Sequence, residues 1–193
     1  MKGKDNMLVK NKIKGQVYEK LMEYANKKCD AVMFVANKSG FNENECTLLD
    51  ENMKRIKQQF ADLFLKSRNG RNWIFSAKMN IHGNPNFDDL FEILFYKFDE
   101  KLKEYMLTNK DLYDWFNPDR PEDISIFKNG YCWLYSITHE EMCDIYCEDE
   151  KEYEYLKSIG IEFWESKFTP IPQNELYYED YGLNNTDNSE NAN

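Results

Sequence analysis

An Asn129-Gly130 dipeptide joins two runs that are rich in β-branched and aromatic residues, 124–127 and 131–137. Both positions of a tight two-residue hairpin turn need a positive φ, and Asn-Gly adopts that conformation at low cost. A third run, 142–147, follows a short polar stretch and is long enough to return antiparallel to the second. The sequence therefore predicts an antiparallel meander near residues 124–147.

Two segments carry apolar residues at the three- and four-residue spacing of an amphipathic helix, 47–66 and 87–106. The second begins with acidic residues and ends with lysines, which complements the helix dipole. Shorter signals predict helices over 16–28 and 148–158 and strands over 31–35, 73–77 and 161–164. We expect a single α+β domain in which the antiparallel sheet packs against amphipathic helices.

Composition limits this domain to the middle of the chain. Aromatic residues make up 16% of the 193 residues, and their apolar area offsets the conformational entropy that folding removes. Residues 1–12 are rich in lysine, and the residues from 169 onward are rich in Asn, Asp and Glu. We expect a flexible Lys-rich arm over 1–12, the α+β domain over 13–168 and a largely disordered tail over 169–193.

The sequence also predicts a cellular location. No stretch approaches the roughly 18 apolar residues of a membrane-spanning helix, and the first residues lack the apolar core of a signal peptide. The five cysteines show no Cys-x-x-Cys spacing, which favours reduced thiols over a disulfide framework. We expect a cytoplasmic protein with no membrane partner and, since no glycine-rich phosphate loop is present, no cofactor.

The formal charge of −10 is unevenly distributed along the chain. Residues 1–78 contain 16 Lys and Arg against 9 Asp and Glu, whereas residues 79–193 contain 9 against 26. Eight of these carboxylates lie between positions 139 and 154. Because complementary charge attracts a partner and speeds the encounter, we expect a basic protein partner. The predicted contacts are Glu140, Asp144, Tyr146, Glu148 and Glu150.

Three alternatives compete with this interpretation. His139 and Glu140 are weak candidates for the catalytic pair of a small metal- or His-dependent enzyme, since histidine is the usual proton shuttle near neutral pH. His139, Cys143 and Cys147 have ligand spacing for a helix, but 142–147 is predicted to be a strand, so we favour core packing of the cysteines over a metal site. Nucleic-acid binding through the Lys-rich N-terminal part is disfavoured by the acidic remainder of the chain.

One block of the sequence resembles a known group of proteins. Trp115, Pro118 and Pro121-Glu122-Asp123 are followed by Gly130, Trp133 and His139-Glu140. This pattern resembles a block in small uncharacterised bacterial proteins for which no activity is known. The resemblance implies that the proline corner, the hairpin and the His-Glu pair form one unit, and it implies no chemistry.

The acidic half and the missing catalytic motifs together predict a function. We expect an acidic protein-binding module or inhibitor, of the immunity-protein or phage anti-defence type, that covers a basic surface of a partner such as a nuclease. The sequence leaves the oligomeric state open.

Overall fold

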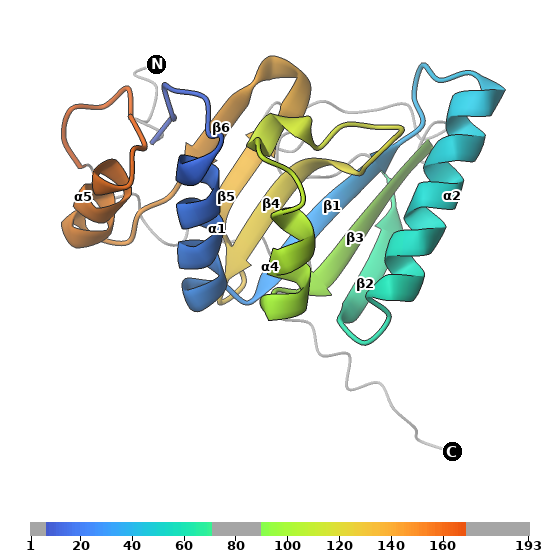
Figure 1. Cartoon of the computed structure of the whole chain (residues 1–193), viewed down its shortest axis with the longest axis horizontal. Helices are drawn as coiled ribbons and strands as arrows, with labels where there is room; N and C mark the ends of the chain where they lie inside the picture. The colour runs from blue at the N-terminus through green and yellow to red at the C-terminus, as the bar shows by residue number, and fades with distance from the viewer. Residues whose placement is uncertain (1–6, 71–89, 169–193) are drawn as a thin grey trace.

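The computed structural model describes residues 7–70 and 90–168 of the chain (Figure 1). Within these ranges the elements are α1 (Gln16–Lys28), β1 (Ala31–Asn37), α2 (Glu43–Gln59), β2 (Phe64–Asn69), β3 (Phe91–Lys97), α4 (Glu100–Met106), η2 (Leu112–Asp114), β4 (Glu122–Lys128), β5 (Tyr131–Ile137), η3 (Thr138–Glu140), β6 (Met142–Ile145) and α5 (Glu150–Ser158).

The strands form one six-stranded sheet in the order β2-β3-β1-β4-β5-β6, and every neighbouring pair is antiparallel. The predicted hairpin joins β4 to β5, where Asn129 and Gly130 have φ angles of 48° and 83°. These positive angles explain why the turn needs Asn-Gly. β6 returns along β5, so the meander predicted near 124–147 is confirmed.

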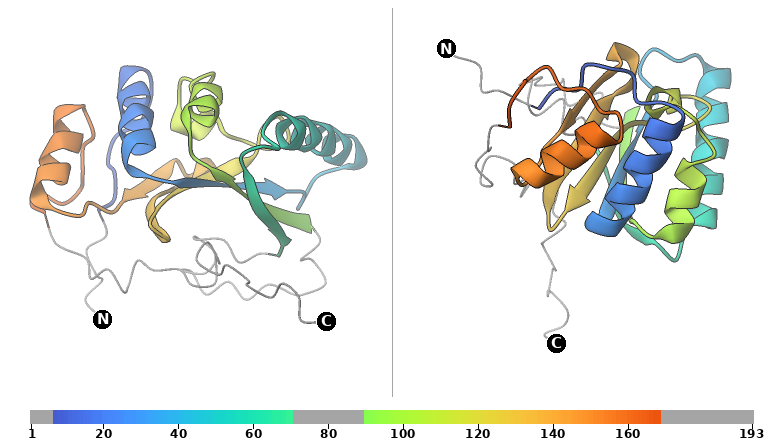
Figure 2. Two further views of the ribbon diagram at one scale, coloured as in Figure 1. Left: turned by 90° about the horizontal axis from the view of Figure 1, so that it is seen from below. Right: turned by 60° about the vertical axis from the view of Figure 1, so that its left-hand side comes forward.

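The helices of the described residues pack side by side on one face of the sheet. Figure 2 shows them in the order α5, α1, α4, α2 from the β6 edge to the β2 edge. An aromatic core lies between the two layers, where the rings of Phe34 and Trp115 stack with centroids 5.5 Å apart. The Trp115 indole donates a hydrogen bond of 3.1 Å to the Tyr18 hydroxyl, which donates to the Met106 carbonyl. The expected α+β fold class is therefore confirmed.

The helix predicted over 47–66 begins and ends earlier than expected. Asn42 is the N-cap of α2: its side chain accepts from the backbone N–H groups of Asn44 and Glu45, and the Glu45 carboxylate accepts from the Asn42 backbone N–H. This capping box starts the helix at Glu43. The helix ends at Gln59, and the last part of the predicted helix turns back into strand β2.

The helix predicted over 87–106 is wrong for most of its length. Residues Phe91–Lys97 form strand β3 between β2 and β1, and only Glu100–Met106 is helical. The Asp99 side chain accepts a hydrogen bond from the Leu102 backbone and starts this short helix. Hydrogen bonds to β1 on one side and β2 on the other satisfy the backbone of β3, which favours a strand although its apolar residues also have helical spacing.

The Lys-rich arm predicted over 1–12 is attached to the sheet in its described part. Leu8 forms an antiparallel bridge with Asp144 of β6, and Val9 forms one with Phe163. Met7 and Val9 are buried, so this part of the arm packs against the α+β domain, while the expected flexibility of the arm stays a prediction. Where an edge strand was expected over 161–164, the structure has only the isolated bridge at Phe163. The strand predicted over 73–77, the tail over 169–193 and residues 1–6 lie outside the described residues.

Candidate functional site

His139 and Glu140 lie on the short helix η3, where both side chains are exposed. The His139 imidazole makes an edge-to-face contact with the exposed ring of Phe116, with centroids 6.5 Å apart. An exposed imidazole lacks the enclosed, water-poor surroundings in which an acid-base pair is usually tuned. The geometry gives no support to the enzyme alternative centred on this pair.

Cys143 and Cys147 are both buried at the β6 edge of the core. Burial raises the pKa of both thiols, which keeps them protonated. Within the described ranges, no group of three or more His, Cys, Asp or Glu side chains could hold a metal ion. His139 is exposed while the two cysteines are enclosed, so the favoured core packing of the cysteines agrees with the structure.

Asp144 and Tyr146 were predicted as partner contacts, but both are buried, with 3% and 2% of their surface exposed. The Tyr135 hydroxyl donates a hydrogen bond to the Asp144 carboxylate from the neighbouring strand. Neither side chain offers surface to a partner, so their assignment to a binding surface is wrong. The alternation of β6 placed Asp144 outward on sequence grounds, but the face it occupies is itself enclosed.

Glu148 and Glu150 lie on the surface at the start of α5. Glu148 forms an ion pair with Lys128 and accepts a hydrogen bond of 2.6 Å from the Tyr131 hydroxyl. Partial burial alone would raise the pKa of Glu148, but Lys128 and Tyr131 outweigh it and hold the pKa below its usual value. Glu150 takes part in no ion pair within the described residues, so its charge is available to a partner.

Glu152 is a site residue that sequence reasoning missed. The residue is buried, with 6% of its surface exposed, and its carboxylate accepts three hydrogen bonds, from the Tyr24 hydroxyl at 3.0 Å, the Trp133 indole at 3.2 Å and the Glu148 backbone at 2.6 Å. The Glu152 backbone in turn donates to the N-cap residue Asp149. The Asp149-x-x-Glu152 spacing is a local capping signal, but Tyr24 and Trp133 come from distant elements and leave no local trace.

These residues surround a hollow between α1 and α5, which we name the α1–α5 pocket. Its volume is about 250 Å³, and its lining residues are Tyr24, Lys28, Glu148, Asp149, Lys151, Glu152 and Tyr155. The rings of Tyr24 and Tyr155 are tilted by 31° with centroids 4.5 Å apart, and Tyr155 is 42% exposed. The pocket therefore combines an accessible aromatic wall with a buried carboxylate.

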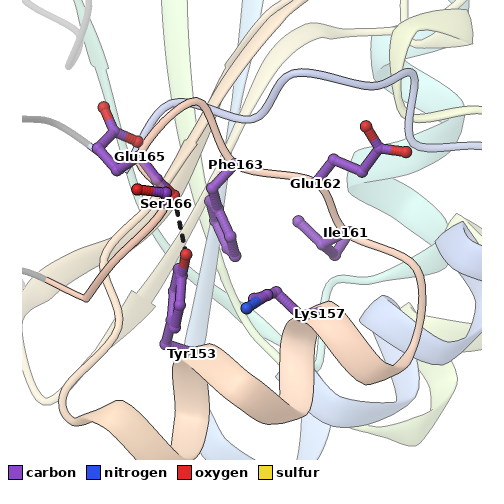
Figure 3. Close-up of a pocket in the computed structure, with 7 residues that line it drawn as sticks. All are labelled: Tyr153, Lys157, Ile161, Glu162, Phe163, Glu165 and Ser166. Atoms are coloured by element: carbon purple, nitrogen blue, oxygen red, sulfur yellow. Dashed lines mark hydrogen bonds between the residues drawn. The ribbon is translucent and has the colours of Figure 1, made fainter.

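A second hollow lies on the other side of α5, with a volume of about 400 Å³. Figure 3 shows Tyr153 and Lys157 reaching it from the helix, while the other labelled residues come from the loop that follows. The Tyr153 ring stacks on Phe163, and its hydroxyl donates to the Glu165 carbonyl at 2.8 Å. The Lys157 ammonium lies 4.9 Å from the Tyr153 centroid and pairs with Glu154, so an internal cation already occupies this aromatic surface.

The exposed carboxylates near β6 and α5 form a group that we name the acidic edge: Glu140, Glu141, Glu148, Asp149, Glu150, Glu154 and Glu162. Two N-terminal lysines lie on it, because Lys12 pairs with Glu141 at 2.5 Å and Lys10 pairs with Glu162 at 3.6 Å. These ion pairs bring part of the basic N-terminal charge onto the acidic edge, so the positive and negative charges are less separated in the fold than along the sequence. Glu140, Asp149 and Glu150 remain outside the ion pairs of the described residues.

Comparisons with known proteins add no assignment: no family model, curated protein or solved structure matches the chain. Within the described ranges, no helix is both long and apolar enough to cross a membrane.

Proposed function

We propose that this chain is a protein-binding module or inhibitor that covers a basic surface of a partner, such as a nuclease, with its acidic edge. The observation that carries the proposal is the group of exposed carboxylates at Glu140, Asp149 and Glu150, which form no ion pair with the described residues, near an aromatic-walled pocket. Complementary potentials steer such a pair together and reject partners of the wrong sign. Immunity proteins and phage-encoded inhibitors of defence nucleases work in this way, and we place this chain in a bacterial cytoplasm.

The arrangement favours a protein partner over a nucleic acid. Phosphates are repelled by the acidic edge, and Lys10 and Lys12 of the N-terminal segment are engaged with its carboxylates. Aromatic surface near carboxylates suits a protein interface, where tyrosine and tryptophan often supply much of the binding energy. Trp164, which is 64% exposed and lies two residues after Glu162 in the sequence, is a further aromatic ring near a carboxylate of the acidic edge.

The test compares two variants that remove the same charge from different places. The edge variant combines Glu140→Gln, Glu150→Gln and Glu154→Gln, all at exposed positions of the acidic edge. The control variant combines Glu43→Gln, Glu51→Gln and Glu104→Gln, which are exposed on α2 and α4. Basic proteins captured by the wild-type chain are titrated against all three proteins by calorimetry.

We expect the edge variant to lose about tenfold or more in affinity and the control variant to change by less than about threefold, because only close charge pairs contribute strongly. The wild-type affinity should also fall as salt is added. Equal losses in the two variants, or no loss in either, contradict the proposed function.

A further inference from the structure

Glu152 is a buried carboxylate with no cationic partner among the residues that the structure describes. No Lys, Arg or His nitrogen of the described residues lies within ion-pair distance of it, although only 6% of its surface is exposed. Buried charges are normally paired, because removing a carboxylate from water is costly. A carboxylate offers about four acceptor positions, and three are used by Tyr24, Trp133 and the Glu148 backbone. One acceptor position therefore remains open.

The walls of the α1–α5 pocket are suited to a cation. The Tyr24 ring lies 4.5 Å from the Tyr155 ring between centroids, and these two rings form the aromatic part of the pocket wall, while Trp133 packs behind Tyr24 at 6.0 Å. The Lys28 ammonium lies 5.8 Å from the Tyr24 centroid and so already occupies that ring, whereas the Tyr155 ring is 42% exposed and offers the accessible aromatic face. Aromatic faces attract cations through their negative quadrupole.

Carboxylates outnumber ammonium groups in the wall of the pocket, which contains Glu148, Asp149 and Glu152 beside Lys28 and Lys151. Glu152 also acts on its neighbours: burial first, and then the charge of Glu152, raise the pKa of the Tyr24 hydroxyl and of the Cys147 thiol.

We propose that the α1–α5 pocket receives one arginine side chain of the basic partner. The planar guanidinium stacks on the exposed Tyr155 ring and donates to the carboxylates of Glu152 and Asp149. Arginine fits better than lysine because its planar group stacks on aromatic rings and presents several donors in a fixed fork. The inference rests on the proposed function, since it names the side chain by which the partner is recognised.

The test uses a small probe and needs no partner. Nα-acetyl-arginine N-methylamide is titrated into the full chain, and the indole N–H resonance of Trp133 reports binding because that group is bonded to Glu152. The resonance is assigned with Trp133→Phe. We expect a saturable shift with a dissociation constant on the order of 1–10 mM, as befits one side chain. The citrulline analogue, which has the same shape and no charge, should give no saturable shift.

Two variants locate the binding. Tyr155→Ala removes a half-exposed ring and should weaken arginine binding by about threefold or more. Phe116→Ala is the matched control, because it also removes a half-exposed ring and Phe116 does not line the α1–α5 pocket. Equal binding of arginine and citrulline, or unchanged binding in Tyr155→Ala, would overturn the inference.

The result is separable from that of the proposed function. If the edge variant loses the partner while arginine does not bind the pocket, the function stands and the arginine inference falls. If arginine binds the pocket while the edge and control variants keep equal affinity for the partner, the inference about the pocket stands and the proposed function falls.

Discussion

Gly160 holds α5 against α1, and replacing it by alanine tests how the α1–α5 pocket is built. Gly160 has φ of +105°, and a Cβ placed there would lie 2.9 Å from the Cγ2 atom of Val17 at the start of α1. The substitution therefore adds two penalties. A left-handed conformation costs an L-residue about 1–2 kcal/mol, and forcing a methyl group into a filled site costs about 1–3 kcal/mol.

We expect Gly160→Ala to lower the free energy of unfolding by about 2–4 kcal/mol, allowing for partial movement of Val17. Gly40→Ala is the matched control, because Gly40 has φ of +84° and no heavy atom within 4 Å of the added Cβ. It should lose only about 1–2 kcal/mol. Urea unfolding followed by circular dichroism measures both values.

The double variant Gly160→Ala/Val17→Ala separates the two penalties of the single change. Removing the Val17 methyl groups relieves the close contact and leaves the backbone strain, so part of the loss should be recovered relative to Val17→Ala. Equal losses for Gly160→Ala and Gly40→Ala, with no coupling to Val17, would refute the claim that α5 packs closely on α1.

Three further predictions follow from single residues. Cys46 is the one partly exposed cysteine, so the native protein should react with a thiol reagent at a single site, and Cys46→Ser should abolish that reaction. The pKa of Glu148 is lowered from its usual 4.5, so its stabilisation is present above that pH and is lost as the pH falls through the lowered pKa. The free energy of unfolding of Glu148→Gln should therefore depend less steeply on pH in this acidic range. Gly130→Ala should lower the melting temperature, because Gly130 has φ of 83° in the hairpin turn.

The meander was predictable because its signal is local. Asn129-Gly130 specifies a turn that only antiparallel neighbours can use, and the flanking runs are too short to be mistaken for helices. Strand β3 carried no such signal. Its central residues Ile93, Leu94, Phe95 and Tyr96 are all fully buried, so both faces of the strand are apolar. A continuous apolar run satisfies helical spacing as well as strand spacing, and only the neighbours β1 and β2 decide between them.

The candidate site was predictable in its charge and not in its geometry. The acidic run around α5 correctly indicated Glu148 and Glu150 as surface groups. It could not indicate that Asp144 faces an enclosed layer or that Lys10 and Lys12 return to neutralise part of the run. Nor could it indicate that Tyr24 meets Glu152, because that contact joins helices separated by more than 100 residues. Such contacts depend on the folded sheet and not on local sequence.

The most direct test of the binding surface is amide hydrogen exchange with and without the captured basic partner. The account predicts slower exchange on binding in the peptides that cover residues 138–158, which include Glu140 and Glu150, and unchanged exchange across α2 and β2 at residues 43–69. Protection confined to 43–69, with no change at 138–158, would contradict the claim that the acidic edge meets the partner.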